Sequence, residues 1–356
     1  MNEGDILMTS KERVRAAITH QNPDQIPAAF EAVHSVVQKL LHHYYFTSYD
    51  QLLDKFQIDI VPVSPRYIGP PLKEYYNDKN QLVRQSYWGF EETFYHTDVD
   101  TYTITSHFPL AGVETVEEVN AVPFPDPDWF DYSEITRQCR KYPDKAIITG
   151  HEGPFLIVTF LIPMDEFFML MIDSPEVAKR ILERMLEFEL EYYRRILEAG
   201  NGLIDIIRPH DDYGTQISLL FSVDMWREFF MENTKKLTAL AHRYNAFYQQ
   251  HSCGAVRPLI PDFIDCGVDV LEPLQKVKGL EPESLWEAFG GKITFHGGID
   301  TQKVLPYGTL EEVSKETAYY MKSLHHNGGY ILMASQCFEG DVPVENIEAV
   351  YQVPRK

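Results

Sequence analysis

The chain has 356 residues, of which 44% are hydrophobic and 24% charged, as expected for a globular protein with a substantial core. Its net charge of −21 argues against binding to nucleic acid or to an anionic membrane surface, because both need basic residues in excess. The most apolar run, residues 155–162, is too short to span a bilayer, and residues 1–15 lack the apolar core of a signal peptide. We therefore expect a cytoplasmic protein with neither nucleic acid nor a membrane as partner.

Short β-like runs alternate with helical stretches along the whole chain, without a linker-like segment between them. Eight strands separated by helices predict a single-domain (β/α)₈ TIM barrel over residues 1–356. A doubly wound sheet is the alternative, but the first strand is not followed by a Gly-rich dinucleotide turn. The expected strands are residues 26–30, 58–63, 146–149, 203–208, 246–250, 268–271, 293–295 and 330–334.

Three helices are the most clearly marked. The first covers residues 175–199, with Ser174 as N-cap and Gly200 as its C-terminal stop. The second covers residues 224–244, and the third, residues 310–325, opens on Thr309 with Glu312 three positions later, a capping box.

An aromatic-rich insertion is expected around residues 66–105. Within it, residues 81–102 alternate in polarity like a β-hairpin. The tyrosines and phenylalanines between Tyr87 and Tyr102 have two interpretations: they wall an aromatic pocket, or they belong to the core.

The segment His251-Ser252-Cys253-Gly254 is the strongest indication of chemistry in the chain. In an extended segment, residues two apart project to the same side, so one metal ion can bind both His251 and Cys253. Cys337, far downstream, would complete a His/Cys/Cys set and leave one position open, as in catalytic zinc sites. The alternative is a simple turn, with Cys337 buried as a small hydrophobic residue.

Four cysteines in a chain of this size do not suggest a disulfide framework, and we expect Cys139 and Cys266 to be packing residues.

Further polar residues follow the predicted strands, where a barrel places its active site. Asp212 is a candidate general acid or hydrogen-bond partner of His251, with an N-cap as the alternative. Glu272 is a candidate fourth metal ligand, alongside water or substrate; otherwise it is a solvated loop carboxylate. His296 is either a hydrogen-bond donor to the ligand or a buried core histidine. Asp211 and Asp300 also lie just after strands.

Several segments resemble the uroporphyrinogen decarboxylase superfamily, in the same order and over nearly the whole chain. This resemblance implies a (β/α)₈ barrel, in agreement with the strand pattern. The matching segments are residues 9–18 with 23–27, then 211–216, 251–254, 297–300, 328–332 and 341–347.

Within that superfamily the chain looks more like the methyltransferases that act with corrinoids. The methylcobalamin:coenzyme M enzymes and the O-demethylase methyltransferases carry His-x-Cys and a distant Cys as zinc ligands, which His251, Cys253 and Cys337 match. The resemblance thus implies zinc, a partner protein carrying a corrinoid (cobalamin), and a small methylated substrate, either a methoxylated aromatic compound or a thiol. The decarboxylases follow their first strand with arginines that hold porphyrin carboxylates, whereas residues 28–34 here contain none.

Two other functions stay open at this point. One is decarboxylation of a porphyrinogen-like acid, and the other is a non-catalytic barrel with a vestigial site. The oligomeric state is also open, a homodimer included.

Overall fold

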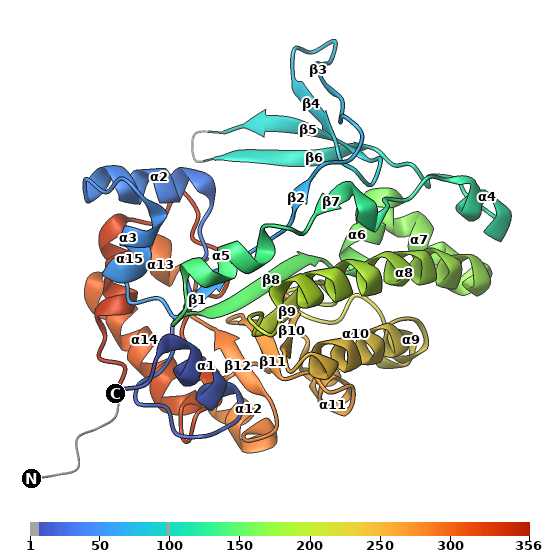
Figure 1. Cartoon of the computed structure of the whole chain (residues 1–356). Coiled ribbons are helices and arrows are strands. Elements are labelled where there is room, and N and C mark those ends of the chain that lie inside the picture. The colour runs from blue at the N-terminus through green and yellow to red at the C-terminus, as the bar shows by residue number, and fades with distance from the viewer. Residues whose placement is uncertain (1–6, 98–99) are drawn as a thin grey trace, which may run out of the picture.

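In this computed structural model of the protein, residues 7–97 and 100–356 are described (Figure 1). Seven parallel strands form one curved sheet in the order β1-β8-β9-β10-β11-β12-β13, with helices on its outer side. The predicted barrel is confirmed, and each of these strands overlaps a predicted one. Their bounds are Ile60–Pro62 (β1), Ala146–Glu152 (β8), Ile206–His210 (β9), Phe247–His251 (β10), Val270–Leu274 (β11), Thr294–Gly297 (β12) and Tyr330–Ile331 (β13).

The eighth predicted strand, residues 26–30, closes the barrel between β13 and β1 without forming a regular ladder. Ala29 donates its N–H to the carbonyl of Leu332 at 2.9 Å, and Leu332 donates in return to Pro27 at 2.8 Å. On the other side, the N–H of Asp59 reaches the carbonyl of Ala28 at 2.8 Å. Because Pro27 has no N–H to donate, this segment makes fewer ladder bonds than its neighbours.

Most of the helices cover the outside of the barrel. The bounds of the α-helices with seven or more residues are Ser10–Ile18 (α1), His34–His43 (α2), Tyr49–Lys55 (α3), Ile135–Lys141 (α5), Pro154–Leu161 (α6), Met164–Asp173 (α7), Pro175–Gly200 (α8), Val223–Phe229 (α9), Met231–Arg243 (α10), Pro282–Phe289 (α12), Leu310–Leu324 (α14) and Val344–Gln352 (α15). The shorter ones are Val116–Ala121 (α4), Ile260–Asp265 (α11) and Val304–Tyr307 (α13).

The helix ends agree with the predictions in part. The capping box of Thr309 and Glu312 is present at the start of α14. In α8, however, Gly200 is still helical, and Asn201 ends the helix in the left-handed conformation at φ 48°. Ser174 precedes that helix, but its side chain makes no capping hydrogen bond.

The helix predicted over residues 224–244 is wrong in one respect, because the chain breaks at Phe230 into α9 and α10. Phe230 is fully buried, and its ring centroid lies 5.3 Å from that of Phe221 and 5.4 Å from those of Phe155 and Tyr213. Periodicity alone could not reveal this break, because the apolar spacing continues through it while aromatic packing fixes Phe230.

The amino-terminal half of the barrel interior is apolar and is plugged by α1. Val14 and Ile18 of that helix join the inward side chains of the strands in one buried cluster. Its other members are Ala29, Ile60, Ala146, Ile148, Ile206, Val270, Ile331 and Met333. The barrel interior at this end is therefore a packed apolar core, and the polar side chains that point into the barrel lie toward the opposite end.

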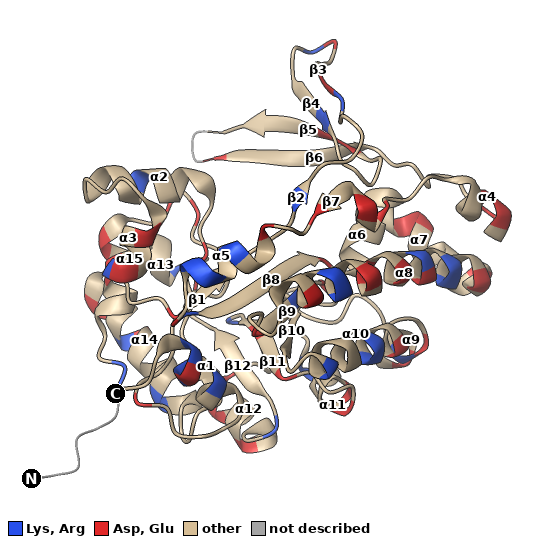
Figure 2. Ribbon diagram, viewed as in Figure 1, with Lys and Arg blue, Asp and Glu red and all other residues tan. Residues whose placement is uncertain are grey.

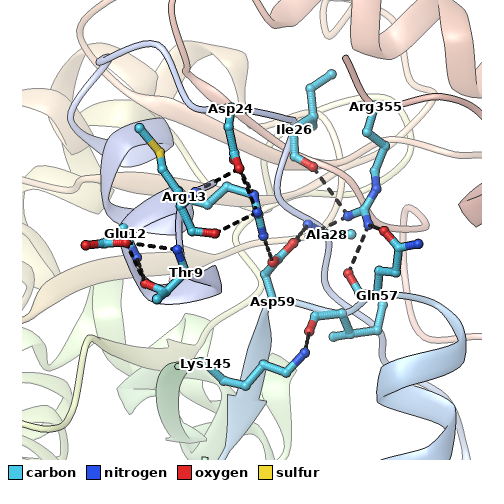
Figure 3. A network of polar contacts seen from close by, with 12 residues as sticks. Thr9, Glu12, Arg13, Asp24, Ile26, Ala28, Gln57, Asp59, Lys145 and Arg355 are labelled. Atoms are coloured by element: carbon cyan, nitrogen blue, oxygen red, sulfur yellow. Dashed lines mark hydrogen bonds and ion pairs between the residues drawn. The ribbon is translucent and has the colours of Figure 1, made fainter. Parts of the chain in front are cut away.

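A buried ion-pair network at the same end joins the two ends of the chain to β1 (Figure 3). Asp59 accepts hydrogen bonds from Arg13 at 2.6 Å and from the N–H of Ala28 at 2.8 Å, and Arg355 lies 3.4 Å away. Arg13 also binds Asp24 at 2.7 Å. The network fixes the barrel-closing segment 26–30 against its neighbour.

The long connection from β1 to β8 carries a separate four-stranded antiparallel sheet, seen above the barrel in Figure 1. Its outer end contacts the barrel through Ser35 and Asp100 at 2.7 Å and through Tyr102 and Glu339 at 3.2 Å. The expected 81–102 hairpin is part of this sheet, and residues 98 and 99 lie outside the described ones. The strands are Glu74–Tyr76 (β3), Leu82–Gln85 (β4), Glu91–His96 (β5) and Thr101–His107 (β6), with a separate pair Arg66–Tyr67 (β2) and Phe130–Asp131 (β7) nearby.

The aromatic residues of this region agree with the core interpretation only in part, and Trp88, Tyr95 and Tyr102 do not wall a pocket. Trp88 is buried against Phe124 and Phe188, so its ring belongs to the core. Tyr95 and Tyr102, in contrast, are exposed on the sheet.

Acidic and basic residues alternate along the outer helices (Figure 2). Within the described part of the chain, no single helix is both long and apolar enough to cross a membrane.

Candidate metal and substrate site

Three metal-binding side chains converge at the carboxyl ends of β9 and β10. Single donor atoms of Asp212, His251 and Cys253 all lie within 4.8 Å of one another. The Nε2 of His251 is 3.6 Å from the Sγ of Cys253 and 3.5 Å from the Oδ1 of Asp212. The predicted pairing of His251 with Cys253 is thus present, with Asp212 on the same side.

The backbone holds this group in place through a tight turn. The N–H of Cys253 donates to Asp212 at 2.8 Å, and the N–H of Gly254 donates to the Oε1 of Gln275 at 2.7 Å. Gly254 has φ +85°, and a Cβ there would come within 2.5 Å of the Gly214 backbone. The glycine of the His-Ser-Cys-Gly segment is therefore required by the close approach of two loops.

Glu272 contacts the Nδ1 of His251, the ring nitrogen that faces away from Cys253 and Asp212. Its Oε2 lies 2.7 Å from the Nδ1 of His251, and the carboxylate is completely buried. Burial alone would raise the pKa of Glu272, but the charges of His251 and Arg208 hold it well below its usual range. Glu272 here orients the imidazole, a position that differs from the fourth-ligand position expected from the sequence.

The same contact controls the charge on His251. Burial would lower the pKa of His251, yet Glu272 and Cys253 raise it well above its usual value. A proton must therefore leave Nε2 before that nitrogen can bind a metal ion.

Arg208 is a central residue of the site that the sequence reasoning missed. It projects from β9 into the barrel, ion-pairs with Glu31 and lies 3.5 Å from the Oε2 of Glu272. An arginine within the apolar run of β9 was the available signal, because a charge in a barrel strand must face a polar interior.

His296 and Gln249 lie in the polar half of the barrel interior and are almost completely buried. Among the described residues, neither side chain finds a hydrogen-bond partner, and the same holds for His210 Nε2 and Glu272 Oε1. Burial lowers the pKa of His296 to about 4, so it is neutral at pH 7. Such groups are normally satisfied by water or a bound molecule, so this layer suits a polar ligand.

Cys337 does not belong to the three-residue group. Its neighbour Gln336 donates its amide to the Sγ of Cys253 at 3.4 Å, which places the loop after β13 at the same mouth. Burial raises the pKa of Cys337 to about 11. Cys139 and Cys266 are buried elsewhere, and all four cysteines are free thiols.

Asp211 and Asp300 have structural hydrogen bonds. Asp211 accepts from the N–H groups of Phe155 and Leu156, each at 2.9 Å, and thereby caps α6. Asp300 accepts the N–H of Gln302 at 2.8 Å.

The donor set fits a zinc ion. An imidazole nitrogen, a thiolate and a carboxylate oxygen are all zinc ligands, and a buried carboxylate on the far imidazole nitrogen is the usual support for a metal-binding histidine.

The sequence profile described as uroporphyrinogen decarboxylase (URO-D) matches residues 104–356. The chain belongs to the uroporphyrinogen decarboxylase family. The match includes every residue of the three-residue group, together with Glu272, His296 and Cys337, and leaves out β3, β4 and β5.

Two curated relatives carry the description methylcobamide:CoM methyltransferase MtaA. The one from Methanosarcina barkeri is 27% identical over 209 residues, and that from M. barkeri strain Fusaro is 25% identical over the same length. The alignments cover 58% of this chain and 57% of each relative, so the chain spans little more than half the length of these proteins.

A solved methyltransferase from Methanosarcina mazei has the same fold. Its TM-score is 0.66 at 18% identity, and the match covers 96% of this chain and 97% of the other. The family and its methyltransferase members thus agree with the resemblance seen in the sequence.

Proposed function

We propose that this protein is a zinc-dependent methyltransferase that moves a methyl group between a small methylated substrate and a corrinoid carried by a partner protein. The observation that carries the proposal is the convergence of His251, Cys253 and Asp212 on one point, with Glu272 behind the imidazole. The curated relatives, described as methylcobamide:CoM methyltransferases, support the same reaction class.

His251 and Cys253 would hold the zinc ion, with Cys337 as the third ligand. When bound, zinc supplies a positive centre that stabilises negative charge on the oxygen or sulfur that gains or loses the methyl group. Asp212, with 40% of its side chain exposed, can bind zinc or exchange a proton with substrate at the mouth of the barrel.

Glu272 contributes by fixing the imidazole. By accepting a hydrogen bond from Nδ1 it directs the Nε2 lone pair toward Cys253, and Arg208 offsets its negative charge. Below it, neutral His296 and Gln249 offer hydrogen bonds to a polar part of the substrate.

The electrostatics of the mouth disfavour a porphyrinogen-like acid. Several carboxylates need several fixed cations, but Arg208 is already neutralised by Glu31 and Glu272. Residues 28–34, where decarboxylases of this family are expected to carry arginines, have none.

The direct test is methyl transfer to a corrinoid protein whose cobalt has been reduced to cobalt(I). Zinc-loaded protein with a methoxylated aromatic donor, or in a second arm a methylated thiol, should convert cobalt(I) to methylcobalt(III), which is followed by absorbance. Cys253→Ser should abolish transfer, while Cys266→Ser, a buried thiol outside the site, serves as the matched control.

Three results would contradict the proposal. These are undiminished transfer by zinc-free protein, loss of carbon dioxide from a porphyrinogen with both methyl donors inert, and failure of the protein to bind zinc. The last would indicate a vestigial site.

A further inference from the structure

A cavity lies between the loop that follows β11 and the helices α13 and α14, apart from the residues of the metal site. Its volume is about 820 Å³, within the range of small-molecule sites. Val277, Leu280 and Val304 form apolar walls, and the rings of Tyr319 and Tyr320 line the same space. The cavity thus offers both volume and aromatic surface to a ring.

The carboxylates that line this cavity are already engaged. Glu312 accepts the N–H of Thr309 at 2.8 Å in its capping box, and Glu281 accepts the N–H of Gly279 at 3.1 Å. Glu316 accepts the N–H of Asp300 at 2.8 Å and pairs with Lys276 at 2.6 Å.

The lysines that line it are only half engaged. Besides Lys276, Lys315 is paired, with Glu311 at 2.6 Å. Lys278 and Lys303 also line the cavity, and across residues 7–97 and 100–356 neither makes an ion pair. Both ammonium groups therefore lack a direct carboxylate partner among the described residues, and the charge of Lys278 acts on the nearby carboxyl of Glu281, whose pKa it helps to lower.

We propose that this cavity binds an aromatic organic anion, a ring that carries a carboxylate or a sulfonate. The ring packs against Leu280, Val304 and Tyr319, while the anionic group lies between Lys278 and Lys303. Two point charges on flexible stems suit a single anionic group, and the apolar walls select against hydrated inorganic anions.

The cavity is separate from the metal site but connected to it by one short segment. Gln275, whose side chain holds the N–H of Gly254, directly precedes the cavity residues Lys276 and Val277. A ligand in the cavity therefore contacts the loop that positions Cys253. Binding itself requires neither zinc nor the proposed methyl transfer.

The test uses 8-anilinonaphthalene-1-sulfonate, an aromatic sulfonate whose fluorescence rises in an apolar site, titrated onto the full chain. We expect saturable binding at one site per chain, weakened by salt. The double variant Lys278→Gln/Lys303→Gln should raise the Kd by about tenfold, since two exposed charge contacts each contribute severalfold in affinity.

Two controls make the result specific. Lys322→Gln removes an exposed lysine of α14, the helix that carries Tyr319 and Tyr320. Lys322 itself does not line the cavity, so this variant should leave the Kd unchanged. Val277→Trp fills the cavity without changing a lysine, and it should displace the probe.

The uncharged analogue N-phenyl-1-naphthylamine should bind wild type and the double lysine variant alike. The proposal is overturned if the double variant binds the sulfonate as tightly as wild type does, or if Val277→Trp leaves binding intact. Circular dichroism of each variant verifies that it is folded, so that weaker binding can be attributed to the changed side chains.

Discussion

The proposed role of Cys337 as the third zinc ligand can be tested directly by substitution. Its neighbour Gln336 contacts Cys253, and Cys253 is among the groups whose charge raises the pKa of Cys337. We expect one zinc per chain in the wild type and a clear loss of zinc in Cys337→Ser, measured by metal analysis after dialysis. Cys139→Ser, which alters a buried thiol on α5, should keep its zinc. Unchanged stoichiometry in Cys337→Ser would remove this residue from the site.

Asp211 is expected to make the stability of the protein depend on pH. Burial raises its pKa to about 7, against an ordinary value of 3.8. Between these two values the folded state holds a proton that the unfolded state has lost, so the free energy of unfolding falls as pH rises from about 4 to about 7. Above pH 7 this contribution becomes flat.

Asp211→Asn tests this expectation. The amide oxygen can still accept the two N–H groups that cap α6, but it has no proton to lose. We expect the variant to be less sensitive to pH than wild type between pH 4 and 7, by a few kcal/mol in urea unfolding. Identical pH profiles for the two proteins would show that Asp211 does not titrate in this range.

The sequence predicted that His251 and Cys253 lie together, as the structure shows, but it did not assign the contacts around them. His251 and Cys253 could be paired because alternation in a strand fixes which side chains share a face. The contact of Glu272 with Nδ1 depends on the register between β10 and β11, where His251 lies opposite Glu272, and register is not legible from one chain. The role of Gln336 was not predictable, because only the folded barrel brings its amide to Cys253, whereas Arg208 was missed although a charge in an apolar strand was a usable signal.

At the scale of elements, most barrel strands were predictable because they contain a short run of buried apolar or β-branched residues. The bounds of strands and helices were predicted less well where contacts between distant residues determine them. Residues 26–30 close the barrel by a few hydrogen bonds, and the break at Phe230 follows from aromatic packing. The strand β3, with three exposed residues, has no burial pattern that would mark it.

The closure of the barrel depends on Asp59. Replacing it with alanine leaves Arg13 and Arg355 without their shared carboxylate and frees the N–H of Ala28. Because unpaired buried charges are costly, we expect a loss on the order of 3–5 kcal/mol in urea unfolding. Arg66→Ala, which breaks the surface pair with Asp131 at 3.0 Å, should change stability little. Equal effects of the two substitutions would contradict the role given to this network.

At the scale of the whole molecule, the core does not depend on the metal site. One large cluster and the apolar plug around α1 hold the barrel together without any candidate zinc ligand. We therefore expect removal of zinc by a chelator to abolish transfer yet leave the circular dichroism spectrum unchanged and the melting cooperative, in contrast to a zinc finger. Collapse of the fold on chelation would show that the metal is structural.

The buried polar groups around Gln249 and His296 are expected to lower the stability of the fold while supporting methyl transfer. Gln249→Met keeps the side-chain volume and removes two buried polar atoms that have no partner among the described residues. We expect a higher melting temperature and slower methyl transfer, both measured on zinc-loaded protein. A lower melting temperature would mean that water already satisfies this amide.

The plugged end and the polar mouth of the barrel therefore differ in how they tolerate change over evolutionary time. Selection should remove substitutions around α1 only when they destabilise the fold, because that end is densely packed and remote from the ligands. Selection should remove substitutions in the polar layer when they slow the reaction, because replacing these buried polar groups with apolar ones would stabilise the fold. Selection for thermal stability alone would thus be expected to replace the polar residues of the mouth first and to keep the apolar plug. The result would be a more stable barrel without methyl-transfer activity.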